Sequence, residues 1–236
     1  MPIDCPGDEK GAVPAPLFRK TSGRNASYCL FLWSAAMASM TPLPRALSLP
    51  LVAAVAGAWY YAHPPSVQWA AVFAAAGFSC IEFSWYATTT EAPNGDLSFT
   101  PFASTCRPGH TTWAQFWANV LYTPLLLFTY RTWLPSAVLR VVLFPLNIWL
   151  LEIIEGYGLM LLFGRNIAWT YNTRDAYFHN NIRTGFAPLW FLLGLALEVI
   201  GYTLVDGLGE AAAQALPIEV AVAGAGLLHA TRYYHG

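Results

Sequence analysis

Six long apolar segments constrain the fold of this chain more than any other feature. At 1.5 Å per residue each gives roughly 27–42 Å of helix, enough to cross a hydrocarbon core of about 30 Å. Of the 236 residues, 56% are hydrophobic and only 11% are charged, whereas soluble domains carry roughly 25% charged residues. We therefore predict an all-α integral membrane protein with about six transmembrane helices around a four-helix core. The segments are residues 45–62, 66–88, 111–134, 136–163, 184–206 and 212–230.

The chain divides by composition into four parts. Residues 1–44 hold a polar N-terminal tail and a short apolar or interfacial segment, which ends at two closely spaced prolines. Residues 45–62 form an additional span, residues 66–206 the four-helix membrane core, and residues 207–236 a C-terminal span and tail. A cleaved targeting segment and a short extra span are the alternatives for the first part.

Basic residues are distributed unevenly between the two sides of this layout. If the N-terminus is cytoplasmic, ten of the 12 lysines and arginines lie inside, and only Arg131 and Arg140 lie outside. Cytoplasmic loops of membrane proteins carry an excess of basic residues. We therefore predict a multi-pass protein whose N- and C-termini are both cytoplasmic, without an indication of which membrane holds it.

Four glutamates lie inside these otherwise apolar segments. A carboxylate in hydrocarbon is costly unless it is neutralised, paired or hydrated, so such acids usually mark function. No lysine and at most one arginine accompanies them, so the expected partner is a proton, a cation, a cationic headgroup, or a hydroxyl or amide donor. The four are Glu82, Glu152, Glu155 and Glu198.

Two of these acids, Glu152 and Glu155, are three residues apart and therefore share a helix face. Two carboxylates that close in a low dielectric cannot easily both ionise, so one should hold a proton. Such a pair suits a proton relay, a cation site or acid–base chemistry. The structural alternative is that the acids only hydrogen-bond neighbouring helices, at about 0.6 kcal/mol per contact.

The segment 164–184 is unusually rich in amide, aromatic and basic side chains. Trp169, Tyr171 and His179 are expected to pack over the cytoplasmic mouth of the helices. With the four glutamates they make up the candidate residues for ligand binding or proton relay, and His179 is a candidate general base. The arginines of this segment are expected to face lipid phosphates. They are Arg165, Arg174 and Arg183.

Several other classes of site are disfavoured. The 5 histidines have no HxxxH or HxxHH spacing and the 4 cysteines no CxxC pair, so we expect no metal, no cofactor and no disulfide framework. A net charge of -1 gives no indication of nucleic-acid binding. No catalytic residue is identified. Aromatic pairs at the span ends, such as Trp85 and Tyr86, are interpreted as membrane anchors rather than ligand-binding groups.

A series of short motifs between residues 77 and 198 resembles a known family in its order. The motifs are Gly77–Glu82, Trp113–Trp133, Trp169–Tyr171, Pro188–Phe191 and Glu198. In this order the chain resembles the transmembrane protein 229 family, which is related to bacterial proteins labelled ABC-transporter type IV. The sequence departs from the family at Thr170, where an acid is usual. The resemblance implies a four-helix membrane core and the choice of acids, but no reaction.

These observations favour a multi-pass membrane protein whose acidic intramembrane cluster binds or passes a small cation, a proton or a polar lipid group. The expected partners are the lipid bilayer and such a ligand. A first alternative is an intramembrane lipid-modifying enzyme that uses Glu152, Glu155 and His179, and a cavity joining His179 to the glutamates would favour it. A second is a structural or accessory subunit with a membrane partner, favoured if the glutamates are capped locally at separate helix seams.

Overall fold

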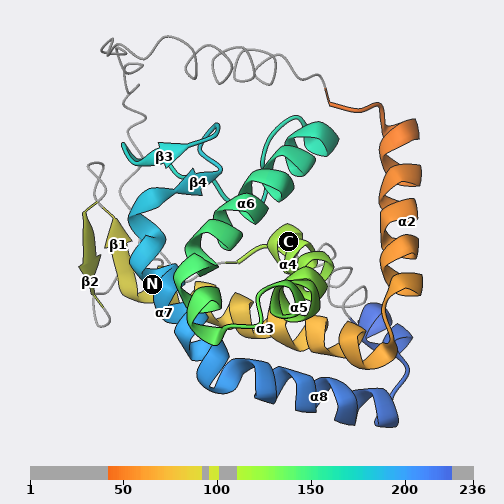
Figure 1. Cartoon of the computed structure of the whole chain (residues 1–236). Helices are drawn as coiled ribbons and strands as arrows, with labels where there is room; N and C mark the ends of the chain where they lie inside the picture. The colour runs from red at the N-terminus through yellow and green to blue at the C-terminus, as the bar shows by residue number, and fades with distance from the viewer. Residues whose placement is uncertain (1–41, 92–95, 101–110, 225–236) are drawn as a thin grey trace, which may run out of the picture.

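The computed structural model describes residues 42–91, 96–100 and 111–224, which are mostly helical (Figure 1). The predicted N-terminal tail with its apolar segment lies outside the described residues except for its last three residues, and the C-terminal tail is described only to residue 224. The helices are α2 (Arg45–Ala62), α3 (Pro65–Thr88), α4 (Trp113–Pro124), α5 (Tyr130–Trp133), α6 (Ala137–Phe163), α7 (Ala187–Ala196) and α8 (Tyr202–Ala215).

Shorter elements connect these helices. The π-helical turns η1 (Leu125–Thr129) and η3 (Leu197–Gly201) join α4 to α5 and α7 to α8, and the 3-10 turn η2 (Thr184–Phe186) leads into α7. Two small antiparallel hairpins cover ends of the helices. They consist of β1 (Thr89–Glu91) with β2 (Leu97–Phe99), and β3 (Ala176–Tyr177) with β4 (Ile182–Arg183).

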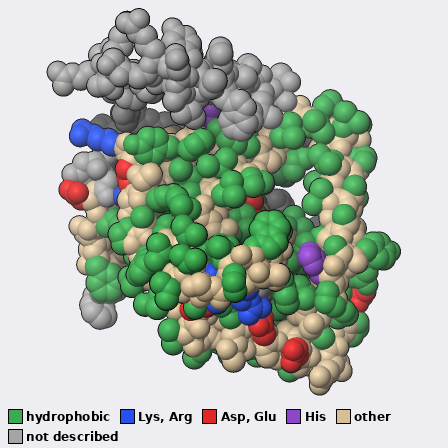
Figure 2. All heavy atoms as spheres, in the orientation of Figure 1, with side chains coloured by type: hydrophobic (Ala, Val, Ile, Leu, Met, Phe, Trp, Pro, Cys, Tyr) green, Lys and Arg blue, Asp and Glu red, His purple; other side chains and the backbone are tan. Residues whose placement is uncertain are grey.

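Three helices within the described residues are long and apolar enough to cross a membrane: Pro65–Thr88, Ala137–Phe163 and Thr184–Ala215. The expected all-helical class is therefore confirmed, whereas six spans stay a prediction. Hydrophobic side chains cover much of the described part of the face shown in Figure 2. Along α6 an apolar stripe at every fourth residue is at least 55% exposed, as expected of a helix face in contact with hydrocarbon. The stripe is Val138, Val142, Leu146, Leu150 and Ile154.

Prolines mark two corners between helices. α2 ends at Ala62, and Pro65 occupies the first turn of α3, where its missing N–H costs nothing. Between α5 and α6 the chain turns at Leu134 and Pro135, and the Ser136 hydroxyl caps α6 by accepting a hydrogen bond from the Leu139 amide at 3.4 Å. The apolar run before this corner is divided by η1, which follows Pro124. Proline cannot donate the usual backbone hydrogen bond, and helices often deform at such a residue.

One predicted boundary is wrong. The sequence prediction separated residues 184–206 from residues 212–230, but α8 continues without a break to Ala215, and the chain breaks only at Leu216 and Pro217. Gly209 lies in the expected gap and is buried against α3, where an added methyl group would overlap the Ser66 carbonyl and the Ala70 side chain. This glycine lets two helices approach closely and does not end the helix.

The helix formed by α7, η3 and α8 changes direction at η3, so its two halves pack on different neighbours (Figure 1). α7 lies against α6, and α8 runs antiparallel beside α3. A π-helical turn is a recognised cause of such bends. Gly194 of α7 lies directly against the buried Phe144 of α6, which brings these two helices close together.

Candidate functional site

A cavity of about 180 Å³ lies where the C-terminal half of α3, the start of α4, the middle of α6 and the first part of α7 meet the segment between α6 and β3. It contains Glu82, Glu152, Trp169 and Tyr171, four of the seven residues singled out from the sequence. Its lining is largely aromatic. The lining residues are Phe78, Ile81, Glu82, Trp85, Tyr86, Gln115, Glu152, Trp169, Tyr171, Phe186, Leu189, Trp190 and Leu193.

Each glutamate of the cavity accepts a hydrogen bond from one neutral hydroxyl group. The Thr111 hydroxyl donates to Glu82 Oε2 at 2.6 Å, from the residue that precedes the cap of α4. The Tyr171 hydroxyl donates to Glu152 Oε1 at 2.8 Å. No lysine, arginine or histidine is among the described residues that line the cavity. The negative charge of an ionised Glu152 would therefore have no cationic partner in its lining.

Three buried polar atoms of lining residues have no hydrogen-bond partner among the described residues: Glu152 Oε2, Gln115 Oε1 and Trp190 Nε1. Buried polar groups in proteins are almost always paired, and an unpaired one costs a few kcal/mol. Two acceptors and one donor in the same cavity therefore indicate that something else, water or a ligand, completes the site.

The aromatic side chains of the cavity form a continuous series of ring contacts. Phe186 lies at the centre, with ring centroids 5.5 Å from Tyr171, 5.9 Å from Trp85 and 6.1 Å from Trp190, each in an edge-to-face arrangement. Trp190 in turn stacks on Phe78 at 6.3 Å. The contacts join rings from α3, η2, α7 and the segment of residues 164–183 that connects α6 to η2. These elements therefore position one another.

The segment between α6 and α7 is held in place by amide side chains. α6 ends at Gly164, whose left-handed φ of 77° suits glycine. Asn166 Oδ1 then accepts hydrogen bonds from the Ala168 and Trp169 amides, and its Nδ2 donates to Asn181 Oδ1 at 2.9 Å. The Trp169 indole donates to the Asn181 carbonyl at 2.8 Å. This network directs Trp169 into the cavity.

His179 does not line the cavity. It lies in a run of three left-handed residues, Phe178, His179 and Asn180, with φ between 53° and 65°, at the turn between β3 and β4. Its Nδ1 is 2.9 Å from the Tyr157 hydroxyl of α6. The cavity therefore does not join His179 to the glutamates, the condition that would favour the enzyme alternative, because the hairpin turn holds its ring against α6.

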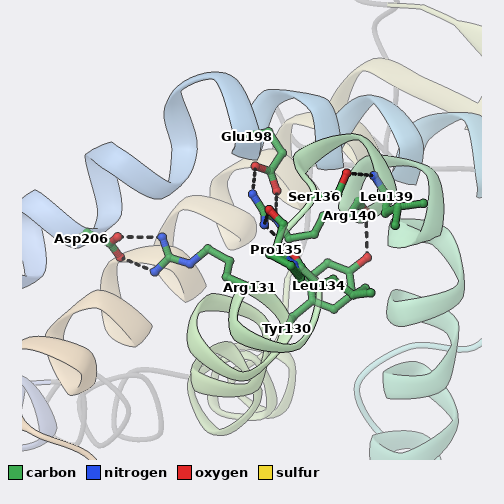
Figure 3. Close-up of polar contacts among 9 residues, drawn as sticks. All are labelled: Tyr130, Arg131, Leu134, Pro135, Ser136, Leu139, Arg140, Glu198 and Asp206. Atoms are coloured by element: carbon green, nitrogen blue, oxygen red, sulfur yellow. Dashed lines mark hydrogen bonds and ion pairs between the residues drawn. The ribbon is translucent and has the colours of Figure 1, made fainter.

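Glu155 and Glu198 also lie outside the lining of this cavity. Glu155 follows Glu152 by three residues on α6, but only Glu152 contributes to the cavity wall. Glu198 is bound by Arg140, whose Nε and Nη2 donate to its two carboxylate oxygens at 2.6 and 2.7 Å (Figure 3). The four acids do not converge, and the expectation that these spans offer no basic partner is wrong for Glu198.

The sequence places Arg140 on the outer side of the layout, at the start of the predicted span 136–163, and gives no sign of its role in the structure. Its Nη1 donates to the Leu134 and Pro135 carbonyls at 2.6 and 2.9 Å, so the guanidinium also caps the end of α5. Beside it, Arg131 pairs with Asp206 of α8 at 2.8 Å (Figure 3). These two ion pairs join the corner between α5 and α6 to the helix formed by α7, η3 and α8.

Arg183 corrects another expectation, because it is only 2% exposed and does not lie free on the surface facing lipid phosphates. Its Nε donates to Asp175 Oδ2 at 3.2 Å, and its guanidinium lies 4.4 Å from the centroid of the Phe186 ring. Burial alone would raise the pKa of the Asp175 carboxyl. The side chain of Thr173 and the hydrogen bonds from Arg183 and the Gly185 amide together outweigh burial and hold this pKa below its ordinary value of 3.8.

This ion pair predicts a pH dependence of stability. Because the pKa of Asp175 is lower in the folded chain, its contribution is complete above about pH 5 and is lost as the pH falls through the folded pKa. We expect the thermal midpoint of the wild type to fall more steeply from pH 5 to pH 3 than that of Asp175→Asn. At pH 7 the variant should be about 1–2 kcal/mol less stable. Parallel slopes for the two proteins would contradict this assignment.

Sequence reasoning missed Gln115, Phe186 and Trp190 and interpreted Trp85 and Tyr86 as membrane anchors. The sequence offers one signal for Trp190, which lies about one turn into an apolar segment that follows an aromatic stretch. A tryptophan at such a position of a helix points back over the residues that precede it. Nothing in the sequence distinguishes a tryptophan in an interfacial belt from one that lines a cavity at the same depth.

No group of three or more histidine, cysteine, aspartate or glutamate side chains within the described ranges is arranged to hold a metal ion. No protein-family model matches this chain, and neither a curated protein nor a solved structure matches it. The resemblance to the transmembrane protein 229 family therefore stays a prediction.

Proposed function

We propose that this chain is a multi-pass membrane protein that binds a small cation, or the positively charged group of a lipid, in the cavity between Glu82 and Glu152. The observation that carries the proposal is the buried Glu152 Oε2, which has no partner among the described residues. Six spans, and termini on the cytoplasmic side, belong to the same proposal.

The missing counter-charge and the acceptors without a partner both support a cationic ligand. A buried carboxylate is stabilised by an opposite charge within a few ångströms, and the cavity lining brings none of its own. Gln115 Oε1 offers a second acceptor without a partner in the same lining. The Tyr171 hydroxyl already orients the Glu152 carboxylate, so the remaining oxygen is available without rearrangement.

The two alternative functions receive unequal support. An enzyme that uses Glu152, Glu155 and His179 would need these groups together, whereas His179 contacts Tyr157 and only Glu152 lines the cavity. A role in holding helices together fits Glu198, which Arg140 binds with both carboxylate oxygens. We assign that structural role to Glu198 and the ligand to the cavity with Glu82 and Glu152.

A thermal-shift experiment with a matched pair of variants tests the proposal. The full-length protein in maltoside detergent is titrated with chlorides of ammonium, methylammonium and tetramethylammonium, with sodium chloride at equal ionic strength as the reference. A ligand at ten times its dissociation constant stabilises by about 1.4 kcal/mol, which raises the midpoint by roughly 3–6 °C. We expect at least one cation to do so, and Glu152→Gln to abolish the shift.

The control is Glu155→Gln, which makes the same change one helical turn away and outside the cavity lining. It should keep the response of the wild type. If no cation shifts the wild type, or if both variants respond alike, the cavity does not bind a cation through Glu152. A Glu152→Gln protein that no longer folds would be replaced by Gln115→Leu, which removes the second acceptor and should weaken binding.

A further inference from the structure

We infer that the ligand of this cavity is a quaternary ammonium group, such as the head of choline or of a choline lipid; this inference rests on the proposed function and specifies its ligand. The charge of Glu152 supports a cation of any kind, whereas the choice of a quaternary ammonium rests on the aromatic side chains that surround the carboxylate. Seven of the lining side chains are aromatic, and only Glu82, Gln115 and Glu152 are acidic or amide residues.

Aromatic rings attract cations through the negative potential of their faces, and several rings around one site are the known solution for quaternary ammonium groups. Here Trp85, Phe186 and Trp190 belong to one connected set of rings with centroid separations of 5.9 and 6.1 Å. Trp85 belongs to α3, whereas Phe186 and Trp190 belong to the helix that begins with η2 and continues as α7, so the rings approach the cavity from two helices. A cation inside the cavity would therefore meet ring surfaces on more than one side.

The cost of removing the ion from water favours a quaternary ammonium over a primary ammonium. A primary ammonium gives up strong hydrogen bonds to water and needs three acceptors in return. Two buried acceptors without a partner, Glu152 Oε2 and Gln115 Oε1, line this cavity among the described residues, and most of the remaining lining is aromatic or aliphatic and offers a primary ammonium few hydrogen bonds. A quaternary ammonium has no N–H group to satisfy and is less costly to remove from water. It would meet the aromatic wall with its methyl groups and the carboxylates of Glu82 and Glu152 with its charge.

The volume of the cavity and its one buried donor without a partner also fit this ligand. A protein cavity of about 150 Å³ holds a benzene ring, so about 180 Å³ accommodates a trimethylammonium head with one or two further atoms. The Trp190 Nε1 donor is buried without a partner. It is suited to an oxygen close to the cation, which choline carries as a hydroxyl and a choline lipid as a phosphate ester.

The test compares affinities within one series of ligands and then separates their sources. For the full-length protein in maltoside, which contains no choline, tetramethylammonium and choline should bind about tenfold more tightly than ammonium or ethanolamine, a difference of about 1.4 kcal/mol. The neutral isostere 3,3-dimethyl-1-butanol should bind more weakly than choline. In vesicles, phosphatidylcholine should stabilise the protein relative to phosphatidylglycerol if the source is a lipid, whereas only free choline should do so if it is a solute.

Two ring variants on different helices check that the aromatic wall is responsible. Trp190→Leu and Trp85→Leu should each lower the affinity for tetramethylammonium about tenfold, while Trp190→Phe, which keeps a ring, should lose less. Ammonium or ethanolamine binding as tightly as choline would overturn the inference and leave the proposed function intact. Equal binding of choline and the neutral isostere would also overturn it. If no cation binds at all, the inference and the proposed function fail together.

Discussion

Replacing Arg140 with methionine is expected to lower the free energy of unfolding by about 3–5 kcal/mol, because it leaves Glu198 buried without its counter-charge. The side chains of Arg140 and Glu198 are only 12% and 11% exposed, and they are joined by two hydrogen bonds of 2.6 and 2.7 Å. The same substitution removes the donors to the Leu134 and Pro135 carbonyls, so the end of α5 also loses its cap.

Chemical or thermal unfolding in detergent measures this effect, and a double variant isolates the pair. Arg140→Met combined with Glu198→Leu removes both charges and should recover a large part of the loss, because two apolar groups are tolerated where one unpaired charge is not. Asp206→Asn is the matched control, since the Arg131–Asp206 pair is 24% and 35% exposed and should contribute about 1 kcal/mol or less. Equal costs for Arg140→Met and Asp206→Asn would contradict this account.

The second large effect is expected at Gly156, where alanine should destabilise the protein by about 2 kcal/mol. A methyl group at this position of α6 would overlap the side-chain amide of Asn181, which is 0% exposed. Asn181 cannot yield easily, because its Oδ1 accepts from Asn166 and its carbonyl accepts from the Trp169 indole. The change should therefore loosen the 164–183 segment and displace Trp169 from the cavity.

Gly158→Ala is the control, because nothing lies within 4 Å of a methyl group added there, two residues along the same helix. It should change stability by less than about 0.5 kcal/mol. Unfolding measurements give the difference in free energy, and limited proteolysis of the 164–183 segment reports its loosening. If both alanine variants behave alike, the contact between α6 and Asn181 does not hold the segment.

The bounds of α3 and α6 could be predicted because they depend on local signals. Apolar runs and the prolines at Pro65 and Pro135 define α3 and α6 to within a few residues. The bend at η3 could not be predicted, because hydrophobic periodicity assumes a straight helix. This is why the partner of Glu198 was missed: the contact with Arg140 depends on how the bent helix meets the corner between α5 and α6.

The candidate site was predictable in its acids but not in its walls. Glu82 and Glu152 stand out because a carboxylate in an apolar segment is rare, and Trp169 and Tyr171 because their segment is polar and aromatic at once. The rings of Trp85 and Trp190 do not stand out, since tryptophan is common at membrane interfaces. Composition identifies residues that are costly to bury, whereas only the tertiary arrangement reveals which ordinary residues surround them.

The bent helix also connects two walls of the cavity, one formed by α7 and the other by α3. Trp190 belongs to α7, the upstream arm of the bent helix, while the downstream arm, α8, is fastened to α3 through Gly209 and thereby to the helix that carries Glu82. The rings on α7 and the acid on α3 are therefore joined through one bent helix, whose bend contains Glu198 and contacts Arg140.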